Sequence, residues 1–261
     1  MAFNNGENFV QAGEARLWSI CTGKGTPTLV FNGGPGCDDY LGTVAELIED
    51  RCRVIRFEPR GCGRSSWDKN YDLQTLLNDA DTVREKYGHE RVLLLGHSHG
   101  PCVALAYAMR FPERVIGVIG IAGGKVVDDR SWSATYDAMK GTEDTGRLVF
   151  EADEDVNKQG NNSWKAYCRR PELFGDLARL RAKAVFINAS QDIRPNWPTQ
   201  QLAHLIPRAE YVEIDGAAHF VWLTHPAELR AELRKAMNFI LDDQSATDDS
   251  ESVMSDENNP L

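Results

Sequence analysis

The chain has 261 residues with a formal net charge of −10, and 42 % of its residues are hydrophobic. This length suits one large α/β domain with an ample core, and the composition is ordinary for a soluble globular protein. Basic residues are not clustered, so a nucleic-acid partner is not expected. The longest apolar segment, residues 115–122, is far too short to span a bilayer, and no membrane partner is expected either.

The net charge is concentrated at the C-terminal end. Residues 242–261 hold seven of the 39 acidic residues and no Lys or Arg, which leaves a nearly balanced body with 32 acidic and 29 basic residues. This end is polar and offers almost nothing apolar to bury. We therefore expect residues 242–261 to form a disordered acidic tail that acts as a solubilising appendage.

The first eight residues contain no basic start and no apolar stretch, so no signal peptide is expected. The cysteines are scattered along the chain and show no paired metal-binding spacing. Free thiols in a reducing compartment are the expected state, which favours a cytoplasmic protein. The six cysteines are Cys21, Cys37, Cys52, Cys62, Cys102 and Cys168.

Segments typical of strands and helices alternate along most of the chain. This alternation predicts an α/β fold with a mostly parallel central sheet and helices on both faces. In chain order we expect a hairpin over 8–23, a strand over 28–31, a helix over 41–49, a strand over 53–57, a helix over 73–87, a strand over 92–95, a helix over 102–109, strands over 115–121, 184–188 and 210–214, and a helix over 227–241.

Residues 125–180 break this alternation. They are rich in Asp, Lys, Arg and Trp and contain no convincing strand. We expect a small helical cap insertion here, with residues 1–124 and 181–241 forming the core domain. A pair of ordinary surface helices is the alternative interpretation.

A sharp turn from strand to helix is predicted around Ser98. The apolar run over 92–95 leads into Gly96-His-Ser-His-Gly100, and a helical pattern follows. Small residues two places to either side of the serine are needed because the backbones crowd at such a turn. This sequence motif is that of a nucleophile elbow, in which the serine hydroxyl is held exposed in front of a helix N-terminus.

A serine hydroxyl is a poor nucleophile unless an imidazole takes its proton, and the imidazole needs a carboxylate to set its tautomer. In this topology the partners follow in the chain order Ser, acid, His, each after a later strand. Asp192 follows the strand over 184–188, and His219 follows the strand over 210–214. We therefore predict Ser98 as nucleophile, Asp192 as orienting acid and His219 as general base. Asp215 is a rival acid, although its position before Gly216 is typical of a turn.

The oxyanion formed in acyl transfer needs hydrogen-bond donors already aimed at it. The backbone N–H of His99 is one predicted donor, and Gly34 in the glycine turn after the first parallel strand is the other. A phosphate loop is an alternative for this turn, but neither of the usual glycine-rich spacings is present. His97 and His99 lack accompanying metal ligands, so no metal and no cofactor are expected.

Two further segments resemble a known family. Asn32-Gly-Gly-Pro-Gly36 and Glu58-Pro-Arg-Gly-Cys-Gly-Arg-Ser65 are similar to the paired motifs of the proline iminopeptidases, a branch of the α/β-hydrolase superfamily. The resemblance implies a serine hydrolase with an acyl-enzyme intermediate and the α/β-hydrolase fold over residues 9–241. The histidines on both sides of Ser98 are closer to esterases than to that branch.

The resemblance leaves the substrate open. A small ester or amide, including a short peptide with N-terminal proline, is one expectation, and an ester, lactone or C–C bond hydrolase is another. A non-catalytic ligand-binding protein on the same fold is a third. The residues expected to contact the substrate are Gly33, Trp132, Trp164 and Tyr167.

Overall fold

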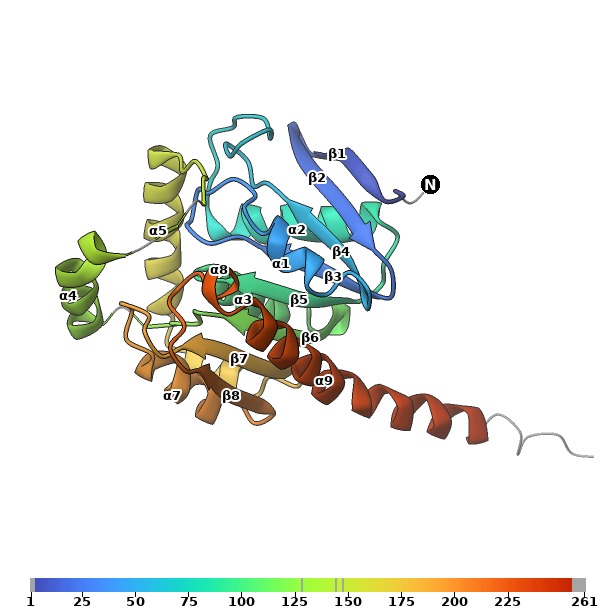
Figure 1. Cartoon of the computed structure of the whole chain (residues 1–261). Helices are drawn as coiled ribbons and strands as arrows, with labels where there is room; N and C mark the ends of the chain where they lie inside the picture. Colours follow the sequence, from blue (N-terminus) through green and yellow to red (C-terminus); the bar gives the residue numbers. More distant parts are fainter. Residues whose placement is uncertain (1–2, 128, 144, 147, 255–261) are drawn as a thin grey trace, which may run out of the picture.

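The computed structural model describes residues 3–127, 129–143, 145–146 and 148–254, with side chains up to residue 242. Eight strands form one sheet in the order β1-β2-β4-β3-β5-β6-β7-β8 (Figure 1). β1 and β2 form an antiparallel hairpin, β2 pairs antiparallel with β4, and all the other neighbours are parallel. The strands are β1 Gly6–Ala12, β2 Ala15–Gly23, β3 Thr26–Phe31, β4 Cys52–Phe57, β5 Val92–His97, β6 Val115–Ile121, β7 Lys183–Ala189 and β8 Ala209–Ile214. The predicted strands are all present.

The sheet is buried on both faces. Along β5, Val92 and Leu94 belong to one hydrophobic cluster, while Leu93 and Leu95 belong to the other. This is the alternation of a strand covered on both sides, and it explains why the segment is a continuous apolar run. One face is covered by α2 Leu73–Lys86, α3 Gly100–Arg110, α6 Leu173–Ala178 and α7 Trp197–Leu205, and the other by α1 Gly42–Glu46, α8 Val221–Thr224 and α9 Pro226–Met254.

Local signals in the sequence explain where α2 begins and which face it buries. The Asp72 carboxylate caps the helix by accepting a hydrogen bond from the Thr75 N–H at 2.7 Å. Leu73, Leu77 and Val83 lie on the buried face, while Arg84 and Lys86 occupy the last turn, where basic charge is favourable.

The final helix departs from the expectation. Its buried residues recur at helical spacing up to Ile240, as predicted, but the backbone of α9 stays helical to Met254. The helix is therefore longer than the predicted range 227–241, while the disorder of the acidic tail stays a prediction. The segment contains neither Gly nor Pro to end the helix, and low hydrophobicity removes packing without removing the backbone hydrogen bonds. The rest of the predicted tail, 255–261, lies outside the described residues.

Residues 125–180, named here the cap segment, connect β6 to β7. They contain α4 Arg130–Met139, a short 3₁₀ turn Lys140–Thr142 (η2), α5 Glu154–Cys168 and the covering helix α6. Asp129 and Asp153 cap α4 and α5 through hydrogen bonds from the N–H groups three residues ahead. Figure 1 shows α4 and α5 at one end of the sheet, away from the body of α9.

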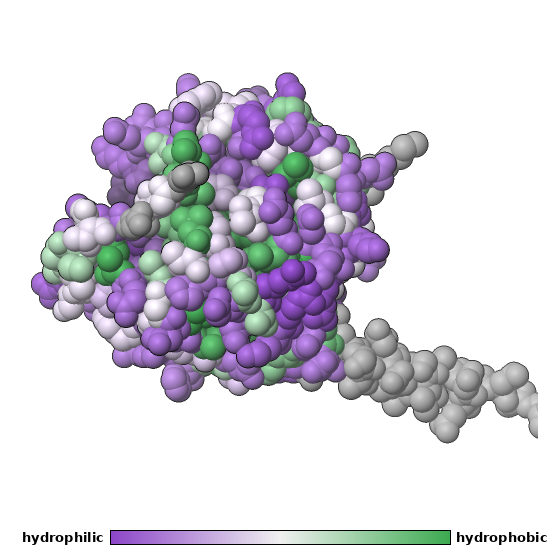
Figure 2. Space-filling model, in the orientation of Figure 1, coloured by the Kyte–Doolittle hydropathy of each residue, from purple (hydrophilic) through white to green (hydrophobic). Residues whose placement is uncertain are grey.

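The visible surface is mixed in polarity. On the face shown in Figure 2, apolar residues form small areas separated by hydrophilic ones. Among the described residues, no helix combines the length and the hydrophobicity needed to cross a membrane.

Candidate active site

The segment around Ser98 forms the predicted sharp turn. β5 ends at His97, Ser98 has a φ of +61°, and α3 begins at Gly100. A positive φ is strained for a serine and marks a position held by its surroundings. A Cβ on Gly96 would collide with the backbone of Gly100, and one on Gly100 would collide with the carbonyl of Phe31. The two flanking glycines are therefore required by crowding.

Asp192 and His219 meet at the ends of β7 and β8. The His219 Nδ1–H donates to Asp192 Oδ2 at 2.6 Å, and the two side chains are only 3 % and 2 % exposed. Burial alone would raise the pKa of Asp192, but the hydrogen bond from His219 and the nearby charges hold it below its ordinary value. This bond leaves Nε2 of His219 available for proton transfer. The rival Asp215 instead accepts a hydrogen bond from Ser190 in the turn before Gly216.

Ser98, Asp192 and His219 line one cavity of about 540 Å³. The Ser98 hydroxyl and the His219 ring share this cavity without a hydrogen bond between them in this structure. Such bonds are often long before substrate binds and tighten during the reaction. The three predicted residues are thus brought together from three loops at one end of the sheet.

The predicted oxyanion donors border the same cavity. Within the described residues, the N–H groups of Gly34 and His99 donate no hydrogen bond, and both residues line the cavity near Ser98. The loop that carries Gly34 is held by α5, because Asn157 Nδ2 donates to the Pro35 carbonyl at 2.6 Å and the Asp153 N–H donates to the Gly36 carbonyl at 3.0 Å. Two donors held in advance are what a developing oxyanion needs.

His97, at the end of β5, is fully buried and joins two loops through its ring nitrogens. Its Nε2–H donates to the His219 carbonyl at 3.1 Å, so its Nδ1 accepts from the Tyr40 hydroxyl at 2.7 Å. The Tyr40 oxygen in turn accepts from the Gly33 N–H at 2.8 Å. Burial holds the pKa of His97 well below its ordinary value, so the ring stays neutral. Sequence analysis missed this link.

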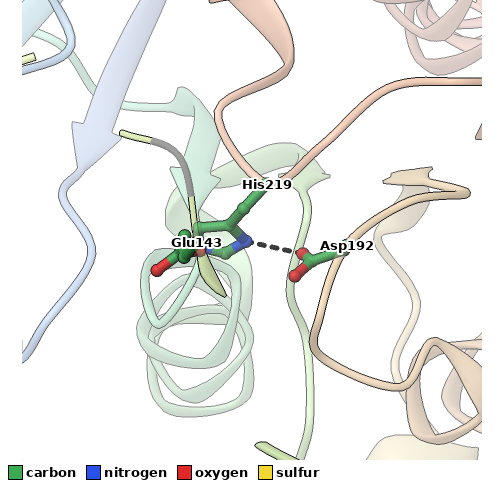
Figure 3. A group of neighbouring side chains, drawn as sticks. All are labelled: Glu143, Asp192 and His219. Carbon is green, nitrogen blue, oxygen red and sulfur yellow. Dashed lines mark hydrogen bonds and ion pairs between the residues drawn. The ribbon is translucent and has the colours of Figure 1, made fainter. Parts of the chain in front are cut away.

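Sequence analysis also missed two charged residues beside Asp192 and His219. Figure 3 shows Glu143, from the cap segment, together with Asp192 and His219, and their ligand-type atoms lie within 4.8 Å of one another. Such a group can hold a metal ion. Here its atoms are already engaged, because the Arg194 guanidinium donates to both carboxylates and His219 Nδ1 donates to Asp192.

The predicted substrate contacts are placed in two different environments. Trp132 and Trp164 line the cavity. Tyr167 does not, because it lies one turn beyond Trp164 on α5, with the two rings stacked at 5.4 Å, and borders a separate pocket beside α2 and α3. Gly33 also lies outside the cavity lining, since its N–H is turned toward Tyr40. Contact of these two residues with a substrate stays a prediction.

All six cysteines are free, and five of them are buried. Cys102 lines the cavity, where burial raises the pKa of its thiol to about 12. His99, which also lines the cavity, has its pKa lowered to about 4 by burial and by the charge of Lys125. Neither group is therefore ionised at neutral pH.

Comparisons with known proteins agree with this geometry. The chain matches the family described as alpha/beta hydrolase fold over residues 26–144. It is 32 % identical over 106 residues to the proline iminopeptidase of Saccharolobus solfataricus, an alignment that covers 39 % of this chain and 34 % of that relative. Over residues 26–144 the sequence is similar to this family, and the described chain has the α/β-hydrolase fold.

Solved structures extend the similarity in fold to most of the chain. A thermophilic esterase from Thermogutta terrifontis aligns with a TM-score of 0.73 at 18 % identity, covering 90 % of this chain and 98 % of that one. The proline iminopeptidase of Mycobacterium smegmatis aligns with a TM-score of 0.69 at 18 % identity, covering 90 % and 99 %. At this identity the likeness concerns the fold. The expected fold class and the resemblance to the proline iminopeptidase branch are confirmed, although the chain spans only about a third of the length of the curated relatives it matches.

Proposed function

We propose that this α/β-hydrolase is a serine hydrolase that uses Ser98, His219 and Asp192 on a small ester or amide. The observation that carries the proposal is the buried Asp192–His219 hydrogen bond of 2.6 Å in a cavity shared with the strained Ser98. The N–H groups of Gly34 and His99 beside the serine add donors for an oxyanion.

In this mechanism the Ser98 oxygen attacks the substrate carbonyl carbon while His219 Nε2 takes the hydroxyl proton. Asp192 keeps Nδ1 protonated and stabilises the imidazolium that forms. The carbonyl oxygen carries the negative charge toward the N–H groups of Gly34 and His99. His219 then returns the proton to the leaving alcohol or amine, and an acyl-enzyme remains. Water, activated by the same histidine, hydrolyses that ester and restores Ser98.

The charges around the cavity favour a substrate without a free amino group. Among the described lining residues the carboxylates are those of Glu143 and Asp192, and both accept hydrogen bonds from Arg194. The lining also contains the cationic Lys125 and Lys165. An ammonium group would therefore enter a cavity whose carboxylates already have a cationic partner, whereas a neutral or acidic ester would not meet this difficulty.

Labelling by a fluorophosphonate probe tests the nucleophile. Wild-type protein is expected to be labelled on Ser98, and Ser98→Ala to lose the label completely, because the probe forms a covalent bond only with an activated serine. Ser131→Ala, which changes an exposed serine on α4, is the matched control and should label like wild type. Equal labelling of wild type and Ser98→Ala would contradict the assignment, and no labelling at all would favour a non-catalytic binding protein.

A second candidate, removal of N-terminal proline, is favoured by the names of the curated relatives. Comparison of proline-β-naphthylamide with short p-nitrophenyl esters separates the two, and we expect higher kcat/KM on the esters. Preference for the prolyl amide, lost when its amine is blocked, would establish the aminopeptidase instead. Lactones and vinylogous diketones in the same panel cover the lactone and C–C bond alternatives.

A further inference from the structure

Arg194 contacts the oxygen of Asp192 that His219 does not use. Its backbone N–H donates to Asp192 Oδ1 at 2.9 Å and its guanidinium donates to the same oxygen at 3.2 Å. The other oxygen, Oδ2, accepts from His219 at 2.6 Å. The two oxygens of the acid are thus divided between two partners, and a carboxylate held at both ends cannot rotate away from the imidazole.

The same guanidinium is held from the other side by the cap segment. Glu143 accepts from both terminal nitrogens of Arg194, with Nη2 to Oε2 at 3.1 Å. The Arg194 and Glu143 side chains are only 17 % and 16 % exposed, so this bidentate pair is well shielded from solvent. Because both carboxylates hold it, the Arg194 guanidinium has a fixed orientation.

Two further contacts seat the cap segment on the loop that carries Asp192. Trp132 Nε1–H donates to the Pro195 carbonyl at 3.2 Å, and the Arg194 guanidinium lies over the Tyr136 ring at 4.9 Å. Both aromatic residues are on α4. The cap segment therefore contacts the catalytic loop at the residues directly after the acid.

We propose that Arg194 is a positioning residue through which Glu143 of the cap segment orients the catalytic Asp192. The proposal rests on the proposed function, since it takes Asp192–His219 as the catalytic pair. The proposal predicts that the charges of Arg194 and Glu143 have opposite electrostatic effects on the Asp192–His219 pair. The charge of Arg194 opposes formation of the His219 imidazolium, whereas the charge of Glu143, within 4.8 Å of the pair, favours it.

Titration of the Asp192–His219 pair, followed by NMR at the His219 ring protons, tests the proposal without any substrate. Arg194→Gln is expected to move the titration midpoint up by about one pH unit. Glu143→Gln is expected to move it down by a smaller amount. Arg194→Lys keeps the charge but loses the fork, so its midpoint should stay close to that of wild type. A role in packing alone would not give shifts of opposite sign.

The remaining titratable groups around the pair are the same in all these variants. Among the described residues they are His97, His99, Tyr40, Tyr136, Cys37, Cys102, Cys168, Lys125 and Lys165. Lys140→Gln, which removes a charge from the exposed Lys140–Asp137 pair of the cap segment, is the matched control and should leave the midpoint unchanged. Shifts of the same sign in Arg194→Gln and Glu143→Gln, or no shift in either, would overturn the proposal.

Fluorophosphonate labelling adds the catalytic readout. If Arg194 orients the acid, Arg194→Gln should label about tenfold more slowly than wild type, with partial rescue in Arg194→Lys. Opposite NMR shifts in a protein that is never labelled would uphold the role of Arg194 and reject the proposed function. Normal labelling in all variants together with unshifted titrations would reject the role of Arg194 and keep the function.

Discussion

Tyr40 links two loops that border the cavity. Its hydroxyl accepts from Gly33, next to the predicted oxyanion donor Gly34, and donates to His97, which holds the carbonyl of His219. Tyr40→Phe keeps the ring but leaves the Gly33 N–H and the His97 Nδ1 without a partner. Because both groups are buried, we expect the free energy of unfolding to fall by about 2 kcal/mol in urea denaturation.

Tyr40→Phe is also expected to lower kcat more than it raises KM, because it loosens loops that carry groups expected to stabilise the transition state. Tyr211→Phe is the matched control, because its hydroxyl donates to Glu213 on the edge strand β8 and Tyr211 does not line the cavity. A change in stability no larger than that of Tyr211→Phe, with kcat intact, would show that the link from Tyr40 to His97 has no such role.

Some residues of the site are indicated by patterns in the neighbouring sequence, whereas others depend on partners that are distant in the sequence. The turn at Ser98 is indicated by its flanking glycines, and Asp192 and His219 are indicated by their places after two strands in a known order, while the catalytic roles of all three stay predictions. The link from Tyr40 to His97 spans 57 residues and that from Glu143 to Arg194 spans 51, and neither has a spacing rule. Only the fold brings these partners together, so their roles could not be predicted from sequence patterns.

At the scale of elements, strands were easier to predict than helices. A strand buried on both faces is a short apolar run, and β5 and β6 are of this kind. The helix α7 escaped prediction because Trp197-Pro-Thr-Gln-Gln mixes polar residues with a proline that suits a first turn but weakens the periodic signal. The helix α9 ends beyond the predicted residue 241, because composition indicates what can be buried and does not indicate where a backbone stops being helical.

The cap segment shows the limit of element-level inference in another way. Its lack of strands and its aromatic content predicted helices between β6 and β7, and α4 and α5 are those helices. The rotation of each helix about its own axis decides which of its side chains face the cavity. Trp164 and Tyr167, only three residues apart on α5, line different pockets.

At the scale of the whole molecule, one acidic side chain ties together three elements on one face of the sheet. Asp81 on α2 accepts from Arg84 and from the Tyr107 hydroxyl of α3, each at 2.8 Å, and from Arg114 in the 3₁₀ turn Pro112–Arg114 (η1). Burial works to raise the pKa of Asp81, but these three donors outweigh it and hold that pKa below its ordinary value. The group therefore stabilises the fold while it is ionised.

The sign of the pH dependence follows from this depressed pKa. The stabilisation by Asp81 is fully present above the ordinary carboxyl pKa and is lost as the pH falls through the lower value of the folded state.

We expect Asp81→Asn to lower the free energy of unfolding at pH 7 by about 2 kcal/mol, because it leaves buried donors and cations poorly matched. The difference from wild type should shrink in urea denaturation as the pH falls below the ordinary carboxyl pKa and through the lower pKa of the folded state, because the wild-type carboxylate then becomes protonated. Asp137→Asn, which removes one partner of an exposed pair, should change stability little at either pH. A difference between wild type and Asp81→Asn that stays constant from pH 7 to about pH 3 would show that the charge of Asp81 does not stabilise this face.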